Sequence, residues 1–201
     1  MFSVLLALAA VFASPARASA QSGTYTVVSG DSMWKIAVRY QIGVSELIAA
    51  NPSVKNPALI KVGQKLNIPS IDDVKTFERQ VAELVNKQRV SAGLAPLKEN
   101  WEVARVARYK SQDMINKKYF AHESPTYGSA FRMMETFGIK FTAGGENIAY
   151  GQKSPAEVMK AWMNSPGHRA NIMSRTYNQL GVGVAKAANG TFYWTQMFIK
   201  G

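Results

Sequence analysis

The sequence predicts an α+β protein made of two modules, a small strand–helix–helix–strand unit followed by a larger mixed domain. Helical and strand-type apolar spacing occur in separate blocks of the chain instead of in a regular strand–helix alternation. Hydrophobic residues make up 47% and charged residues 18% of the 201 residues, which excludes a disordered tail and a coiled coil. Cysteine is absent, so a disulfide framework, a thiolate metal site and a cysteine nucleophile are excluded as well.

The beginning of the chain predicts an export signal over residues 1–20. Residues 1–13 are almost continuously apolar, and the small-residue site Ala18-Ser19-Ala20 follows, after which we expect cleavage. An apolar stretch of about thirteen residues is too short to cross a ~30 Å hydrocarbon core as a helix, so no transmembrane anchor is expected. Because no basic residue precedes the stretch, a misassigned start codon and an uncleaved interfacial segment stay open as alternatives. Export without cysteine favours a bacterial cell envelope.

The net charge of +11 is spread over the chain, since the longest basic run after the leader is the pair Lys117-Lys118. A basic arm for nucleic acid is therefore not expected. A diffuse positive surface suits an anionic matrix outside a cell, such as teichoic acids or phospholipid head groups. Simple solubility explains the same charge equally well.

The first module is expected over residues 24–69. Residues 25–28 alternate as a short strand does, and residues 29–32 supply turn and helix-cap types. Two short helices are predicted around residues 34–40 and 44–50, before a turn and a second strand in residues 62–69.

These motifs resemble a LysM domain over the whole of the first module. The resemblance rests on Tyr25-Thr26-Val27, Gly30-Asp31-Ser32, Trp34-Lys35-Ile36-Ala37, Asn51-Pro52 and the stretch from Val62 to Pro69. It implies binding of N-acetylglucosamine polymers such as peptidoglycan, in a shallow groove between two loops. Carried onto this sequence, the glycan-binding residues are Gly30, Asp31, Ser32, Leu59, Ile60, Lys61 and Val62. Asp31 and Ser32 also fit a role as helix caps only, and Trp34 fits the core better than a sugar-stacking platform.

The second module is expected over residues 72–200. Apolar spacing and capping residues predict four helices, at about 74–91, 100–118, 130–137 and 155–164. Asn189-Gly190 predicts a hairpin that joins strands at 180–185 and 191–199. Gly181 and Gly183 alternate with valines, which would leave one strand face bare enough for a helix to pack closely on it.

Five ordered motifs resemble the bacterial form of the CAP superfamily, the SCP-like extracellular domain. They are His122-Glu123-Ser124-Pro125, a glycine-entered turn at 144–149, the stretch from Trp162 to Ile172, Gly181-Val182-Gly183-Val184, and residues 193–198. The resemblance implies a three-layer α-β-α sandwich in which His122, Glu146 and His168 converge in one cleft.

Two imidazoles and a carboxylate are a set that can hold zinc and activate a water molecule. His122, Glu146 and His168 are thus both the predicted metal ligands, for zinc or another divalent ion, and the predicted catalytic residues. The second glutamate of many eukaryotic relatives is missing, because Met163-Asn164-Ser165-Pro166 occupies its place. Glu123 could substitute as a base, and Ser124 is a weak nucleophile candidate. The rival interpretation is a hydrogen-bonded cluster that ties three loops together.

We therefore expect a secreted protein of the cell wall or envelope, with the spore surface also compatible, that binds peptidoglycan and presents a cleft to a ligand or partner. The alternative is a metal-assisted hydrolase of wall or secreted substrates. A third interpretation is lipid carriage, since some CAP relatives bind sterols or acyl chains. Its apolar groove would use Phe131, Met133, Met134, Phe137, Ile139 and Phe141, although such a stripe is more often core.

Overall fold

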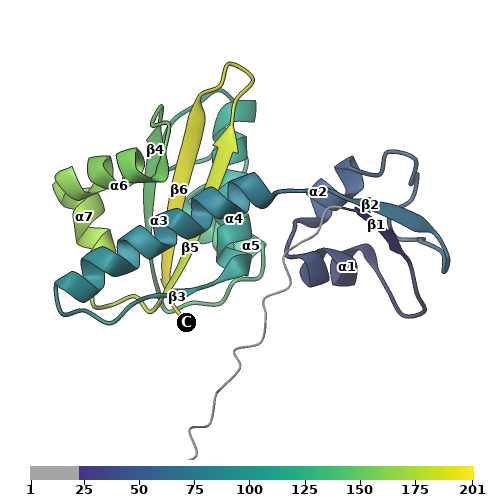
Figure 1. The fold of residues 1–201 in the computed structure, drawn as a ribbon, viewed down its shortest axis with the longest axis horizontal. Helices are drawn as coiled ribbons and strands as arrows, with labels where there is room; N and C mark the ends of the chain where they lie inside the picture. Colours follow the sequence, from purple (N-terminus) through teal and green to yellow (C-terminus); the bar gives the residue numbers. More distant parts are fainter. Residues whose placement is uncertain (1–22) are drawn as a thin grey trace, which may run out of the picture.

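A computed structural model describes residues 23–201, and Figure 1 shows the small first module beside the larger second one. The predicted export signal, residues 1–20, lies outside the described residues. Helices and strands both contribute to each module, which confirms the predicted α+β class.

The first module has the predicted strand–helix–helix–strand order. Its elements are β1 (Gly23–Thr26), α1 (Met33–Tyr40), α2 (Val44–Ala49) and β2 (Lys65–Ile68). The strands pair antiparallel, with Tyr25 opposite Leu66. The side chain of Asn51 ties the end of α2 to β2, because it donates to the carbonyl of Leu47 and exchanges two hydrogen bonds with the backbone of Asn67.

The second module is built around a four-stranded sheet with the order β3-β5-β6-β4. β3 and β5 are parallel, while β6 pairs antiparallel with both β5 and β4. The elements are α3 (Asp72–Ser91), β3 (Lys98–Glu99), α4 (Trp101–Asn116), α5 (Ala130–Thr136), β4 (Ala143–Tyr150), α6 (Pro155–Asn164), α7 (Pro166–Ile172), β5 (Gln179–Lys186) and β6 (Phe192–Lys200).

Helices cover both faces of this sheet, so the second module is a three-layer α-β-α sandwich. Leu180, Val182 and Val184 of β5 face a core that includes residues of α3 and α6. On the opposite face, Met197 and Ile199 of β6 pack in a second core with residues of α4 and α5. Figure 1 shows α3 crossing the strands on the first of these faces.

The glycines of β5 allow α4 to pack unusually close to the sheet, as the valine–glycine alternation predicts. A Cβ atom at Gly183 would lie 2.0 Å from the backbone nitrogen of Arg108, and one at Gly181 would lie 2.3 Å from that of Ala104. Any side chain at either position would therefore push the helix away from the strand.

The turn expected at residues 144–149 is instead the middle of strand β4. Its eight residues pair in register with β6, from Ala143 opposite Lys200 to Tyr150 opposite Tyr193. Gly144 and Gly145 are small because aromatic side chains lie over them: added Cβ atoms would be 2.9 Å from the Phe131 ring and 2.7 Å from the Tyr177 hydroxyl. The glycine pair thus marks a close approach of side chains to a strand.

Two charged residues of α4 are buried. Arg108 is 8% exposed and Lys110 is fully buried. Both have polar partners, because Arg108 pairs with Glu78 and Lys110 donates to the carbonyl of His122.

The two modules contact each other through polar groups of α1 and α2 on one side and of α3 and α4 on the other. Ser45 and Tyr109 share a hydrogen bond of 2.8 Å, and Glu46 lies 3.5 Å from the guanidinium of Arg108. The ammonium of Lys75 in α3 donates to the carbonyl of Tyr40. The short connection after Pro69 therefore joins modules that also touch through polar side chains.

Candidate functional site

The two loops predicted to bind glycan lie side by side in the first module. The amide of Val27 donates to the carbonyl of Gln64 over 2.9 Å, and the amide of Gly63 donates back to the carbonyl of Val27 over 2.8 Å. Around this junction Val28, Leu59 and Val62 are 51%, 69% and 70% exposed. We call residues 28–32 and 59–62 the glycan loops; their exposed apolar side chains lie beside backbone groups, which suits a sugar with an acetyl group.

Asp31 has a structural role within these loops. Its carboxylate accepts hydrogen bonds from the Tyr25 hydroxyl at 2.6 Å and from the Val28 amide at 2.9 Å, and Arg39 lies 3.4 Å away. The bond from Tyr25, followed by that from Val28, lowers the pKa of Asp31 below its usual value. Ser32 caps α1 by accepting from the Lys35 amide, as its position predicts.

We expect the glycan loops to loosen only at very acidic pH. A lowered pKa in the folded state means that Asp31 contributes stability above the aspartate's unfolded pKa and loses it as pH falls through the folded value. In an NMR titration, the Val28 amide resonance should therefore shift with a midpoint below the usual aspartate range. A midpoint inside or above that range, or no loss of the transition in Asp31→Asn, would contradict this assignment.

Trp34 is not the core residue that its helical spacing suggests. It is 58% exposed and is the second residue of α1, the helix that begins directly after residues 28–32. The buried face of this helix is made by Met33, Ile36 and Ala37 instead.

In the second module, His122 and Glu146 meet, as the family resemblance implies. His122 lies in the loop between α4 and α5, Glu146 lies in β4, and the imidazole Nδ1 is 2.6 Å from the carboxylate Oε1. Their side chains are 63% and 4% exposed, so a buried carboxylate holds an accessible ring. The hydrogen bond to Glu146 raises the pKa of His122 above its usual value, against the effect of burial.

This pair lies at one side of a hollow of about 290 Å³, which we call the cleft. Besides His122 and Glu146, it is lined by Ser129, Ala130, Phe131, Gly144, Gly145, Asn171 and Tyr177. The second carboxylate oxygen of Glu146, Oε2, is buried and has no hydrogen-bond partner in the described part of the chain.

Buried and partly buried polar side chains hold the segments around the cleft. Lys110 donates to the carbonyl of His122 at 2.7 Å, which fixes the loop that carries this ring. The fully buried Asn147 donates to the carbonyl of His168 and to the side chain of Gln196. Asn171 in turn donates to Asn147 and to the carbonyl of Glu146, so α7 is tied to β4. Sequence reasoning named none of these four side chains as site residues.

His168 lies near His122, but the three predicted ligands do not form a metal site. Burial, followed by the charge of His122, lowers the pKa of His168. Within residues 23–201, the His168 ring makes no hydrogen bond to His122 or Glu146, and no three His, Cys, Asp or Glu side chains are placed to hold a metal ion. The three side chains are therefore not arranged here as the predicted zinc-ligand set.

Ser124 is a structural residue and not a placed nucleophile. Ser124 is 3% exposed, and its hydroxyl donates a hydrogen bond of 2.7 Å to the carboxylate of Asp113. The same oxygen accepts from the amides of Thr126 and Tyr127, which closes a tight turn.

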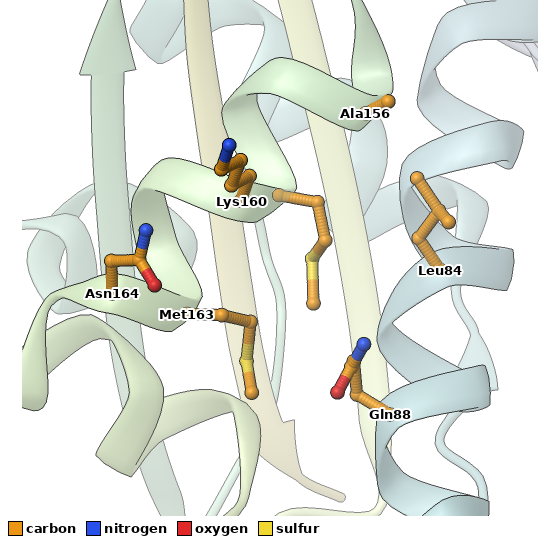
Figure 2. Close-up of a pocket in the computed structure, with 7 residues that line it drawn as sticks. Leu84, Gln88, Ala156, Lys160, Met163 and Asn164 are labelled. Atoms are coloured by element: carbon orange, nitrogen blue, oxygen red, sulfur yellow. The ribbon is translucent and has the colours of Figure 1, made fainter.

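The apolar stripe considered for lipid carriage is mainly core. Met133 and Met134 are fully buried and Ile139 is 8% exposed, with Phe137 and Phe141 packed against them. A different hollow of about 290 Å³ lies between α3 and α6. Figure 2 shows Leu84 and Gln88 of α3 on one side of it and Met163 of α6 on the other.

Comparison with known proteins decides the family. The family model described as "CAP: Cysteine-rich secretory protein family" matches residues 82–198. The chain belongs to the CAP family. Its CAP module contains no cysteine, whatever the family's name suggests. A second family model, that of the LysM domain, matches residues 25–69, so the chain carries both modules.

Three similar proteins illustrate the match. "Uncharacterized protein YkwD" of Bacillus subtilis is 47% identical over 150 residues, which are 74% of this chain and 56% of that protein. The crystal structure of an extracellular protein containing an SCP domain from Bacillus anthracis is 30% identical with a TM-score of 0.59, and the match covers 69% of this chain and 47% of the other. The "Secreted LysM effector ECP6" of Passalora fulva is 45% identical over 47 residues, 23% of this chain and 21% of that protein. The chain thus spans about half the length of YkwD.

Between residues 23 and 201, no helix combines the length and the apolar character needed to cross a membrane.

Proposed function

We propose that this chain is an exported protein of the cell wall or envelope that binds N-acetylglucosamine polymers through its LysM module and presents the CAP cleft to a ligand or partner. The observation that carries the proposal is the exposed apolar surface of the paired glycan loops, where Leu59 and Val62 are about 70% exposed. Single exposed apolar residues need no explanation, but a cluster beside accessible backbone groups favours a binding surface. The net charge of +11 also suits a matrix that contains anionic wall polymers.

The test is incubation of the protein with purified peptidoglycan sacculi, with both pelleted protein and solubilised fragments scored. We expect the protein to pellet and to release nothing. Fragments released by the wild type and not by His122→Ala would instead support the hydrolase alternative. A protein that stays in the supernatant would overturn the proposal.

Leu59→Asp should weaken binding to sacculi by roughly tenfold or more. A carboxylate at this position would have to lose water against the sugar without a partner, and a tenfold change corresponds to only about 1.4 kcal/mol. The matched control is Val90→Asp, which adds the same charge at a residue of α3 that is 59% exposed and outside both sites. Equal weakening in the two variants would mean that charge alone, and not the glycan loops, holds the protein on the wall.

A further inference from the structure

The cleft contains a buried hydrogen-bond acceptor that no group in the described part of the chain satisfies. Oε1 of Glu146 is paired with His122, whereas Oε2 of the same carboxylate is buried and without a partner among residues 23–201. Glu146 lines the cleft and its side chain is 4% exposed. Because buried polar groups are almost always paired, this oxygen calls for a donor from a ligand.

Donor groups lie around the same cleft. Ser129 accepts from the Arg132 amide as the N-cap of α5, which leaves its own hydroxyl proton for a ligand. The ring of His122 has its Nδ1 on Glu146, so its other nitrogen faces away from the carboxylate. That nitrogen is a donor when the ring is protonated, a form that the bond to Glu146 favours by raising the pKa of His122. One acceptor and neighbouring donors are what a secondary amide, with one N–H and one carbonyl, requires.

Two aromatic rings also line the cleft. Phe131 lies over Gly144 and is 43% exposed, while Tyr177 lies over Gly145 and donates to the carbonyl of Gly144 at 3.0 Å. The rings approach the strand because both residues below them lack a side chain. A slot with an apolar wall and a few converging polar groups is typical of a small-ligand site, and an exposed ring can cover the apolar face of a sugar.

An extended peptide fits this place poorly. A peptide would add to the free edge of β4 through the carbonyls of Gly144, Glu146 and Ile148. Those carbonyls already accept hydrogen bonds from the side chains of Tyr177, Asn171 and Trp162, respectively. The edge is therefore closed to strand addition.

From these contacts we infer that the cleft binds the acetamido group of an N-acetylated sugar. The amide N–H donates to Oε2 of Glu146, the carbonyl accepts from Ser129 or His122, and the sugar ring lies against Phe131. The chain would then hold wall glycan at two places, the glycan loops and the cleft. This inference rests on the proposed function, because it assigns to the cleft the same polymer that the LysM module binds.

The test is an NMR titration of the full chain with a pentamer of N-acetylglucosamine, with the glucose pentamer as the comparison ligand. Amide resonances of Gly30 and Gly63 report on the glycan loops, and those of Gly144 and Gly145 report on the cleft. We expect both sets to shift with the acetylated pentamer and the cleft set to stay unchanged with the glucose pentamer. In Leu59→Asp only the cleft set should still shift.

Two variants test the cleft itself. Phe131→Ala should weaken the cleft response at least tenfold, whereas Phe120→Ala, which removes an equally exposed ring at 45% exposure outside the cleft, should change neither response. Glu146→Gln should abolish the cleft response. If the amide oxygen of the new side chain pairs with His122, its NH₂ group faces the ligand N–H, and two donors cannot bond. The control is Glu135→Gln, at an exposed position of α5. If Glu146→Gln does not fold, the comparison of Phe131→Ala with Phe120→Ala still tests ligand binding in the cleft.

The outcomes separate the two claims. Shifts confined to Gly30 and Gly63 would overturn the inference and leave the proposed function intact. Shifts confined to the cleft would overturn glycan binding by the LysM module, and no shift at either place would overturn both. A cleft that responds equally to the glucose pentamer, or only to a wall stem peptide, would also overturn the acetamido assignment.

Discussion

Replacing Gly183 with alanine should destabilise the CAP module by about 3–5 kcal/mol, a large share of the 5–15 kcal/mol that usually holds a domain folded. The new Cβ would lie 2.0 Å from the nitrogen of Arg108 and 2.2 Å from the carbonyl carbon of Ala107. Both are backbone atoms of α4, so no side-chain rotation relieves the overlap. The helix would have to move off β5, which would also break the hydrogen bond from Ser111 to the carbonyl of Gly183.

Urea unfolding followed by circular dichroism measures this loss. The matched control is Gly167→Ala in α7, where an added Cβ meets nothing within 4 Å and where φ is not positive. The free energy of unfolding of that variant should be equal to or up to about 1 kcal/mol above that of the wild type, because alanine has a higher helix propensity than glycine. A loss below about 1 kcal/mol for Gly183→Ala would show that α4 and β5 are not in close contact.

The close packing at Gly183 was predictable because it depends on the local sequence. Glycines at every second position of a strand leave one face bare. The helix predicted at 155–164 is likewise found as α6, which begins at Pro155 and is capped by the side chain of Ser154. Strand β4 was not predictable in this way. Its Gly144-Gly145 pair has the composition of a turn, and only its pairing with β6, about fifty residues later, makes it a strand.

The burial of Lys110 and Arg108 was also not predictable from the sequence. Helical spacing predicts that α4 is a helix, but it cannot show that Lys110 finds a carbonyl and Arg108 a carboxylate inside the protein. At the cleft, the meeting of His122 and Glu146 followed from the family resemblance and not from their separation along the chain. Phe131 and Tyr177 were missed as cleft walls, although the two glycines that they cover were their signal in the sequence.

The buried Arg108 lies where the two modules meet, and it has two carboxylate partners of unequal strength. Glu78 of α3 binds it through two bonds of 2.8 and 2.7 Å and also accepts from the Val184 amide. Glu46 of the LysM module approaches a third guanidinium atom at 3.5 Å. Burial opposes the charged form of Arg108, but Glu78 more than offsets it and holds the pKa above its usual value.

Glu78→Ala should therefore cost about 3–5 kcal/mol, because it leaves a buried guanidinium without its main partner and a strand amide without an acceptor. Glu46→Ala should cost only about 0.5–1 kcal/mol, since its contact is longer and its side chain is 24% exposed. Urea unfolding of the two variants gives both values. If Glu46→Ala were as damaging as Glu78→Ala, Arg108 would act mainly as a link between the modules. The larger loss expected for Glu78→Ala instead makes Arg108 mainly a core residue of the CAP module, to which the LysM module adds a weaker contact.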